Sequence, residues 1–128
     1  MLTLSVMPYS LAIAKLSSSH TLSMELMKDA EFLSITKTKE ELSVVCPEDV
    51  APAAATIEPD WRCLKVEGPL DFGLTGILSS LLEPLAKAKI GIFAISTFDT
   101  DYILVKKENL RKTIAILATF CTIKEVFS

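Results

Sequence analysis

Leucine and isoleucine recur at helical spacing early in the second half of the chain, and this pattern restricts the fold more than any other feature. The positions are Leu74, Ile77, Leu78, Leu81, Leu82 and Leu85. Residues three and four apart lie on one face of an α-helix, so the spacing predicts a helix with one buried face. Such a helix needs a second layer to cover its apolar side.

Segments rich in β-forming residues stand on both sides of this helix. Residues 61–67 precede it, and residues 91–97 and 101–106 follow it as two runs separated by a short turn. A second helical pattern over 110–117 and a last strand over 120–126 complete the order β-α-β-β-α-β. This order predicts an α+β, ferredoxin-like fold in which both helices cover one face of an antiparallel sheet.

The first half of the chain is less regular. Alternating apolar residues over 2–6 predict a strand, whereas the periodicity of residues 9–16 does not decide between strand and helix. Residues 22–27 are compatible with a short helix. The β-rich runs 32–36 and 42–46, separated by charged residues, predict a hairpin.

One segment, residues 47–60, differs sharply in composition from the rest of the chain. Its sequence, PEDVAPAAATIEPD, holds three prolines, four alanines and four acids. Proline disfavours helix interiors and central strands, so we expect a linker here. The chain is then two units in tandem: residues 1–57, which include the linker, and residues 58–128.

The apolar content of the chain predicts self-association. Half of its 128 residues are hydrophobic, which is more than a chain of this size buries easily alone. The strand over 91–97 is apolar on both faces, with Ile92 and Ala94 on one and Phe93 and Ile95 on the other. We therefore expect a homodimer, in which helices cover one sheet face and another sheet or subunit covers the other.

Charge and hydropathy exclude two classes of partner. The formal net charge is −3 and no basic run exists that could follow a phosphate backbone, so nucleic acid is not expected to bind. No uncharged apolar run reaches the length of a membrane span. Residues 1–14 are apolar, but no basic residue precedes the apolar stretch, so a strand is a better interpretation than a signal peptide.

The inventory of reactive side chains argues against catalysis. His20 is the only histidine, which excludes a multi-histidine metal site within one chain. Cys46, Cys63 and Cys121 form no CxxC pair and stand in apolar stretches, which is typical of free thiols in a reducing cytoplasm. No nucleophile with a neighbouring base is evident. We expect a cytoplasmic, non-catalytic protein without metal or cofactor.

Two segments carry candidate binding residues. Residues 68–77 contain three glycines and join a strand to a helix, where free N–H groups could hold an anion; a tight turn with Asp71 as helix cap explains the same residues. Residues 96–101, STFDTD, form a polar strand tip whose two carboxylates could bind an amine. Ordinary turn chemistry is the alternative there.

The same segments resemble the ACT domain. Residues 71–77, DFGLTGI, followed by 85–92, LAKAKIGI, match its pattern of an acid and a glycine before the first helix. The chain is also similar to short bacterial proteins with two ACT-like halves and to the CASTOR-type cytosolic arginine sensors. This similarity is carried by GPLDFGLTGILSSLLEPLAKAKIGIFAISTFDTDYILVK and by FLSITKTKEELSVVCPE, and it extends over nearly the whole chain.

The resemblance implies an amino-acid-binding regulatory module built from two ACT-like units, with the ligand at an interface of units. The positions that it implies for ligand binding are Asp71, Phe72, Gly73, Ser80, Leu81, Thr97, Phe98 and Asp101. Leu74 stands where the arginine sites of this family are expected to hold an acid, so the resemblance does not carry arginine over as the ligand. The alternative function is an ACT-like scaffold that assembles with a partner and binds no small molecule.

Overall fold

The computed structural model describes residues 2–53, 55–68 and 75–125, and the chain divides into two compact units. The N-terminal unit is Tyr9–Trp61, and the C-terminal unit combines Met1–Pro8 with Arg62–Ser128. This division differs from the expected boundary between residues 57 and 58 in two respects, of which the first is that the junction follows Trp61. The second is that the first eight residues belong to the C-terminal unit, because they pair with its strands.

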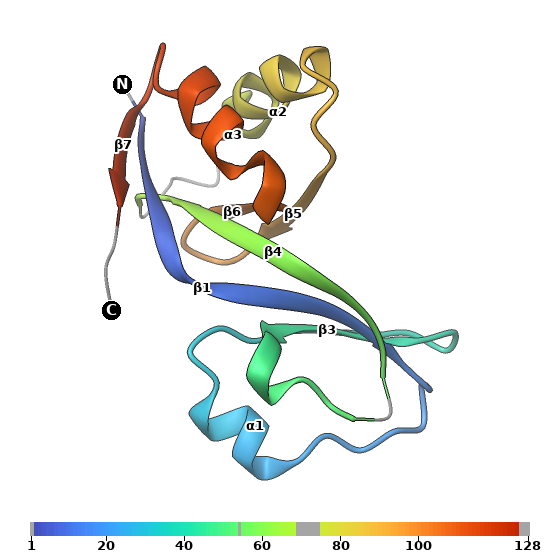
Figure 1. Ribbon diagram of the computed structural model, residues 1–128. Coiled ribbons are helices and arrows are strands. Elements are labelled where there is room, and N and C mark those ends of the chain that lie inside the picture. The colour runs from blue at the N-terminus through green and yellow to red at the C-terminus, as the bar shows by residue number, and fades with distance from the viewer. Residues whose placement is uncertain (1, 54, 69–74, 126–128) are drawn as a thin grey trace. The chain divides into compact units, whose positions relative to one another are not determined.

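The C-terminal unit has the strand and helix order that the sequence predicts (Figure 1). Its elements are the end of β4 (Thr56–Val66), from Arg62 on, and then α2 (Ile77–Lys87), β5 (Ile92–Ser96), β6 (Asp101–Lys106), the short helix η2 (Lys107–Asn109), α3 (Leu110–Leu117) and β7 (Thr122–Glu125). β5 and β6 pair antiparallel from Ile92↔Val105 to Ser96↔Asp101. The expected ferredoxin-like architecture is confirmed for this unit.

β1 (Thr3–Leu16) supplies a further strand to this unit. The strand order is β7-β1-β4-β6-β5, and β7 runs parallel to β1 from Thr3↔Thr122 to Val6↔Glu125. Backbone bonds join the same strands: Glu67 N–H donates to Thr3 O at 2.8 Å, and Thr122 N–H donates to Leu2 O at 2.9 Å. The start of the chain therefore lies between β4 and β7, which is why it belongs to the C-terminal unit.

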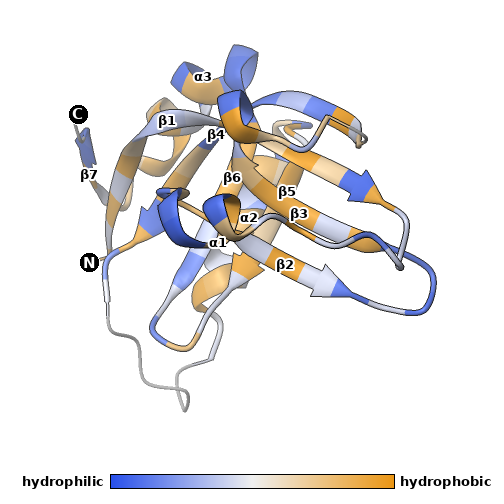
Figure 2. Ribbon diagram, turned by 90° about the horizontal axis from the view of Figure 1, so that it is seen from below, coloured by the Kyte–Doolittle hydropathy of each residue, from blue (hydrophilic) through white to orange (hydrophobic). Residues whose placement is uncertain are grey.

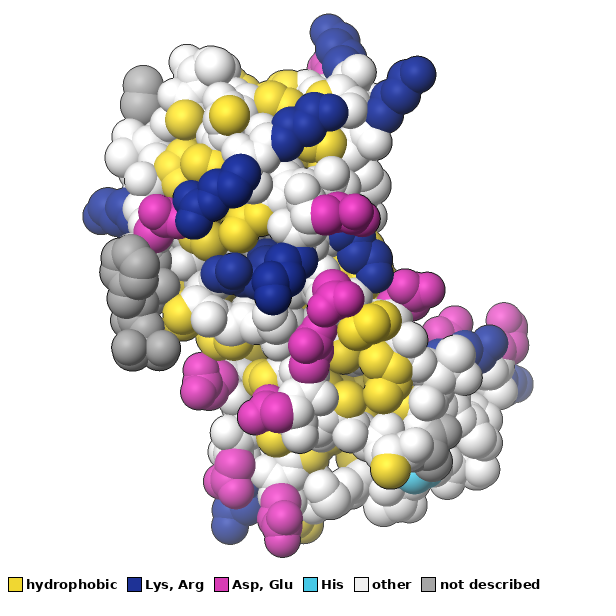
Figure 3. Space-filling view, in the orientation of Figure 1, with side chains coloured by type: hydrophobic (Ala, Val, Ile, Leu, Met, Phe, Trp, Pro, Cys, Tyr) yellow, Lys and Arg dark blue, Asp and Glu magenta, His cyan; other side chains and the backbone are white. Residues whose placement is uncertain are grey.

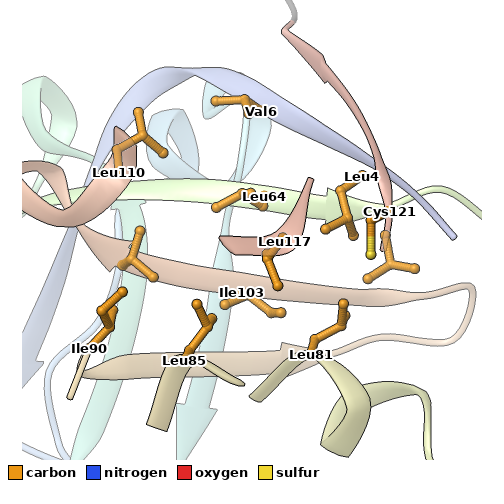
Figure 4. Packing of buried hydrophobic residues seen from close by; sticks show 12 residues of the cluster. Leu4, Val6, Leu64, Leu81, Leu85, Ile90, Ile103, Leu110, Leu117 and Cys121 are labelled. Carbon is orange, nitrogen blue, oxygen red and sulfur yellow. The ribbon is translucent and has the colours of Figure 1, made fainter. Parts of the chain in front are cut away.

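Both helices of the C-terminal unit pack their apolar faces against one face of its sheet (Figure 4). The buried cluster consists of Leu4, Val6, Leu64, Val66, Leu81, Leu85, Ile90, Ile103, Val105, Leu110, Leu117 and Cys121. Burial of each large aliphatic side chain stabilises the fold by about 1.5–3 kcal/mol. Cys63 and Leu104 alternate with members of this cluster and are also fully buried in the single chain, so β4 and β6 are buried on both faces at these positions.

The N-terminal unit contains the predicted hairpin and short helix. β2 (Ser34–Lys37) pairs antiparallel with β3 (Leu42–Pro47), as Figure 2 shows, and β3 pairs antiparallel with residues 11–16 of β1. Residues 9–16, whose state the sequence left open, are therefore strand. α1 (Met24–Asp29) begins at Ser23, whose Oγ accepts a hydrogen bond from Leu26 N–H at 3.2 Å. Such a cap stabilises a helix by about 1 kcal/mol.

The expected linker over residues 47–60 is wrong at its C-terminal end. After β3, the short helix η1 (Glu48–Val50) follows, and β4 already begins at Thr56. Pro59 lies within this strand, and the next residue, Asp60, has a left-handed φ of 67°. Asp60 N–H donates to the Glu48 carboxylate, so an acid of the presumed linker satisfies a backbone group of the strand.

None of the helices in the described part of the chain is long and apolar enough to span a membrane.

Candidate functional site

The turn between β5 and β6 is closed by its own hydrogen bonds. Thr97 N–H donates to Thr100 O at 2.8 Å, and the Thr97 hydroxyl donates to the same oxygen at 3.0 Å. Thr100 N–H approaches Thr97 Oγ1 at 3.3 Å. Phe98 lies at the tip with 79% of its surface exposed. The turn therefore has a defined shape and presents an aromatic ring to solvent.

Thr100 joins this turn to the neighbouring strand. Its side chain is buried, with 4% exposure, and its hydroxyl donates to Val66 O at the last residue of β4. The strand tip thus lies beside the point where the chain leaves β4 towards α2. The sequence reasoning missed Thr100, although adjacent antiparallel strands place the start of β6 beside the end of β4.

Asp101 opens β6 directly opposite Ser96. The Ser96 hydroxyl donates to Asp101 Oδ1 at 2.6 Å, a distance typical of a charge-assisted bond. Within residues 2–53, 55–68 and 75–125, no basic side chain forms an ion pair with Asp101. Ser96 therefore orients the carboxylate through Oδ1, and the negative charge of the group remains suited to binding a cation.

Glu67, at the end of β4, differs from Asp101 in its partners. Its Oε1 accepts a hydrogen bond from the Ser5 hydroxyl at 2.5 Å, and its Oε2 lies 4.0 Å from Lys65 Nζ. A carboxylate that already has a basic neighbour attracts a further cation less strongly. Of the two acids, Asp101 is the better candidate for recognition of a cation.

The start of α2 holds two more of the predicted residues. Ser80 is exposed, but its hydroxyl donates to Ile77 O at 2.6 Å within the first turn of the helix. Leu81 is fully buried in the core, so its side chain packs against the sheet and only its backbone could approach a ligand. Asp71, Phe72 and Gly73 lie outside the described residues.

The cysteines do not provide a reactive thiolate. Burial raises the pKa of the Cys63 thiol to about 12. Burial also raises the pKa of Cys121, and burial together with the charge of Asp49 raises the pKa of Cys46. A thiol rather than a thiolate is present at neutral pH in all three cases, and the thiol is the poor nucleophile.

Metal coordination is likewise not provided for by the described residues. No group of three or more His, Cys, Asp or Glu side chains in that part of the chain could hold a metal ion.

The N-terminal unit has a hollow whose lining includes none of the predicted residues. A cavity of about 580 Å³ is lined by Tyr9, Ser10, Asp29, Ala30, Glu31, Pro47, Glu48, Asp49 and Val50. A second, of about 370 Å³, shares Asp29, Ala30, Asp49 and Val50 with it. Sequence reasoning missed this acidic groove because its lining comes from three separate segments.

Charge is divided unequally between the units. Nine basic and seven acidic side chains give the C-terminal unit a formal charge of +2, whereas four basic and nine acidic ones give the N-terminal unit −5. Figure 3 shows side chains of both signs on one face of the molecule. The net charge of −3 is therefore the sum of a basic C-terminal unit and an acidic N-terminal unit.

Comparison with known proteins identifies the domain type. The ACT-domain model matches residues 56–119, half of the chain, and a model of another family's N-terminal domain matches residues 10–54. The cytosolic arginine sensor for mTORC1 subunit 1 of Bos taurus is 30% identical over 99 residues, covering 69% of this chain and 30% of that protein. The human putative protein CASTOR3P is 30% identical over 93 residues, covering 62% of this chain and 57% of that protein. The matched part thus spans less than two thirds of either relative.

Solved structures share the fold of the chain. A protein of Agrobacterium tumefaciens superposes with a TM-score of 0.90 and 38% identity, covering 99% of this chain and 95% of that chain. An aspartate kinase of Clostridium acetobutylicum shares the fold, with a TM-score of 0.63 at 14% identity over 86% of this chain and 32% of that chain. The match of the family model over a unit with ferredoxin-like order shows that this chain belongs to the ACT-domain family.

Proposed function

We propose that the chain is a non-catalytic regulatory module that binds an amino acid or a closely related small molecule. The observation that carries this proposal is the carboxylate of Asp101, which Ser96 orients at a closed turn and which has no basic partner in the described chain. The name of the bovine relative, a cytosolic arginine sensor, supports both amino-acid binding and a cytoplasmic location. Two ACT-like units in tandem are part of the proposal.

The two ends of the proposed site have opposite charge preferences. Asp101 offers a carboxylate to a ligand ammonium or guanidinium group, and Thr97 and Phe98 lie on the same turn. The start of α2 favours an anion, because its first backbone N–H groups have no partner within the helix. We assign the ligand carboxylate to the free backbone N–H groups at that end. Asp71, Phe72, Gly73, Ser80 and Leu81 belong to the same end of the proposed site, although the Ser80 N–H already donates to Gly76 O at 2.9 Å.

The proposal that the chain is not an enzyme rests on the chemistry of its side chains. Raised pKa values keep the thiols of Cys46, Cys63 and Cys121 protonated. The Ser96 hydroxyl donates to Asp101, but no basic side chain of the described chain forms an ion pair with Asp101. An ordinary carboxylate is by itself a weak base for activating a serine hydroxyl. Binding without turnover is the function that such a site supports.

A scaffold that binds a protein partner is the second candidate function. Met24, Met27 and Val50 are 71%, 51% and 43% exposed, and all three belong to α1 and η1 of the N-terminal unit. Exposed methionines adapt readily to varied apolar surfaces and are common at protein-binding faces. This candidate predicts that no amino acid binds the purified chain.

A thermal-shift screen against the standard amino acids, followed by calorimetry, tests the proposal. Asp101→Asn should weaken binding of the amino acid that the screen identifies by about 2–5 kcal/mol, because a ligand cation loses its charged partner in a partly buried site. The amide keeps an oxygen that can accept the Ser96 hydrogen bond, so the turn should remain closed.

Asp99→Asn is the matched control, since Asp99 lies on the same turn and is exposed. Equal affinities of the wild type and Asp101→Asn would show that the site is placed wrongly. If no amino acid binds at millimolar concentration, the scaffold function takes precedence.

A further inference from the structure

We propose that Thr100 is a positioning residue for ligand recognition: its buried hydroxyl holds the β5–β6 turn against the end of β4, so that Asp101 is presented in one place before any ligand arrives. This inference rests on the proposed function of the turn as a ligand site. Thr100 itself need not touch the ligand.

The burial of Thr100 is unusual for its place in the chain. The four residues before it, from Ser96 to Asp99, are all exposed, whereas Thr100 is 4% exposed. A hydroxyl that leaves water without a partner costs free energy, so burial at this position requires a hydrogen bond. Val66 O supplies that bond.

The bond from Thr100 connects two segments that are far apart in sequence. Val66 is the last residue of β4, and the chain runs from there towards α2. Thr100 also closes the turn locally, because its carbonyl accepts from both the backbone N–H and the hydroxyl of Thr97. One residue therefore fixes the shape of the turn and its position relative to β4.

Fixing the turn in advance favours binding. A ligand that must order a mobile loop loses part of its interaction free energy to that ordering, whereas a preorganised site does not. A valine at position 100 would preserve the branched shape and remove the hydroxyl. We expect Thr100→Val to weaken binding about tenfold, through a turn that no longer has a fixed position.

Thr113 provides a control of the same type. It is a fully buried threonine of α3 whose hydroxyl has no hydrogen-bond partner in the described chain. Thr113→Val makes the same chemical change in the same unit without removing such a bond. Thr100→Ser tests rescue, because serine keeps the hydroxyl and loses only the methyl group.

The experiment measures two quantities for the wild type, Thr100→Val, Thr100→Ser and Thr113→Val. Calorimetry with each standard amino acid at millimolar concentration gives affinity. Hydrogen exchange gives the protection of the Thr97 amide, which donates to Thr100 O, with the amides of β5 as internal reference. We expect weaker binding and faster exchange at Thr97 in Thr100→Val alone, and values near wild type in Thr100→Ser and Thr113→Val.

Each other outcome overturns the inference. Unchanged affinity in Thr100→Val shows that the hydroxyl is not needed, and an equal loss in Thr113→Val shows a general effect on the core. If Thr100→Val does not fold, Thr100→Ser decides: a tenfold loss of affinity there, with unchanged exchange at Thr97, contradicts the role of the hydroxyl. If the wild type binds no amino acid, the proposed function itself fails and Thr100 has no such role.

Discussion

At the scale of single residues, Lys89 occupies a position that suits glycine better. Its φ is 60°, in the left-handed region that lysine rarely adopts. It follows α2 in a Schellman arrangement, in which Lys89 N–H donates to Ala86 O and Ile90 N–H donates to Leu85 O, each at 3.0 Å. Ile90 and Leu85 are both buried, so packing of the apolar residues holds Lys89 in a strained conformation.

Lys89→Gly should therefore stabilise the protein. Removal of the Cβ strain contributes about 1 kcal/mol, partly offset by the greater freedom of glycine in the unfolded state. We expect a small rise in the midpoint of chemical denaturation. Gly76, with a φ of 76°, provides the opposite test. Gly76→Ala should lower the midpoint because of its backbone conformation, since no side chain of the described residues, its chain neighbours apart, lies within 4 Å of the new Cβ. A lower midpoint for Lys89→Gly would contradict this account.

Sequence reasoning worked well for some residues and failed for others, for physical reasons. The polar tip with Asp101 was predicted because its residue types mark a turn. The buried state of Thr100 was not predicted, because it depends on the neighbouring strand β4 rather than on local sequence. Leu81 was assigned to ligand binding by resemblance, while its own helical spacing already indicated the core position that the structure shows.

At the scale of elements, β1 shows how one strand can serve two units. Residues 3–6 pair with β7 in the C-terminal unit, and residues 11–16 pair with β3 in the N-terminal unit. The local apolar pattern predicted strand at the start of the chain but could not reveal a partner more than a hundred residues away. A single boundary along the chain does not describe this strand, because it pairs in both units.

The pairing of β1 leads to a prediction about truncation. A fragment of residues 58–128 contains the predicted β-α-β-β-α-β elements but lacks β1, the strand between β4 and β7. It also loses Leu4 and Val6 from the core, and loss of a single buried leucine side chain typically costs about 2–5 kcal/mol. We expect this fragment to show no cooperative thermal transition by circular dichroism.

Leu4→Ala in the full chain serves as the milder version of this test. It should lower stability by about 2–5 kcal/mol while the fold persists. Lys15→Ala, at an exposed position of the same strand, is the control and should have little effect. A cooperative transition of the 58–128 fragment at the midpoint of the full chain would show that β1 is dispensable.

At the scale of the whole molecule, the structure changes the reason for expecting a dimer. Cys63 and Leu104 are fully buried within one chain, so these central positions do not need a second subunit to cover them. The edge strands provide a better argument. β2 (SITK) and β7 (TIKE) carry charged residues, which discourage pairing between molecules, whereas β5 (IFAIS) carries none and ends its sheet.

We therefore predict a homodimer that pairs through the β5 edge. Light scattering at micromolar concentration should give about twice the chain mass of 14.0 kDa. Ala94→Lys places a charge on an exposed position of β5 and should shift the protein to monomer, because a lysine on an edge strand opposes pairing. Thr36→Lys makes a comparable change on the exposed edge strand β2 and should leave the dimer intact. A wild-type monomer throughout this range would refute self-association, and a dimer that survives Ala94→Lys would place the interface on another surface.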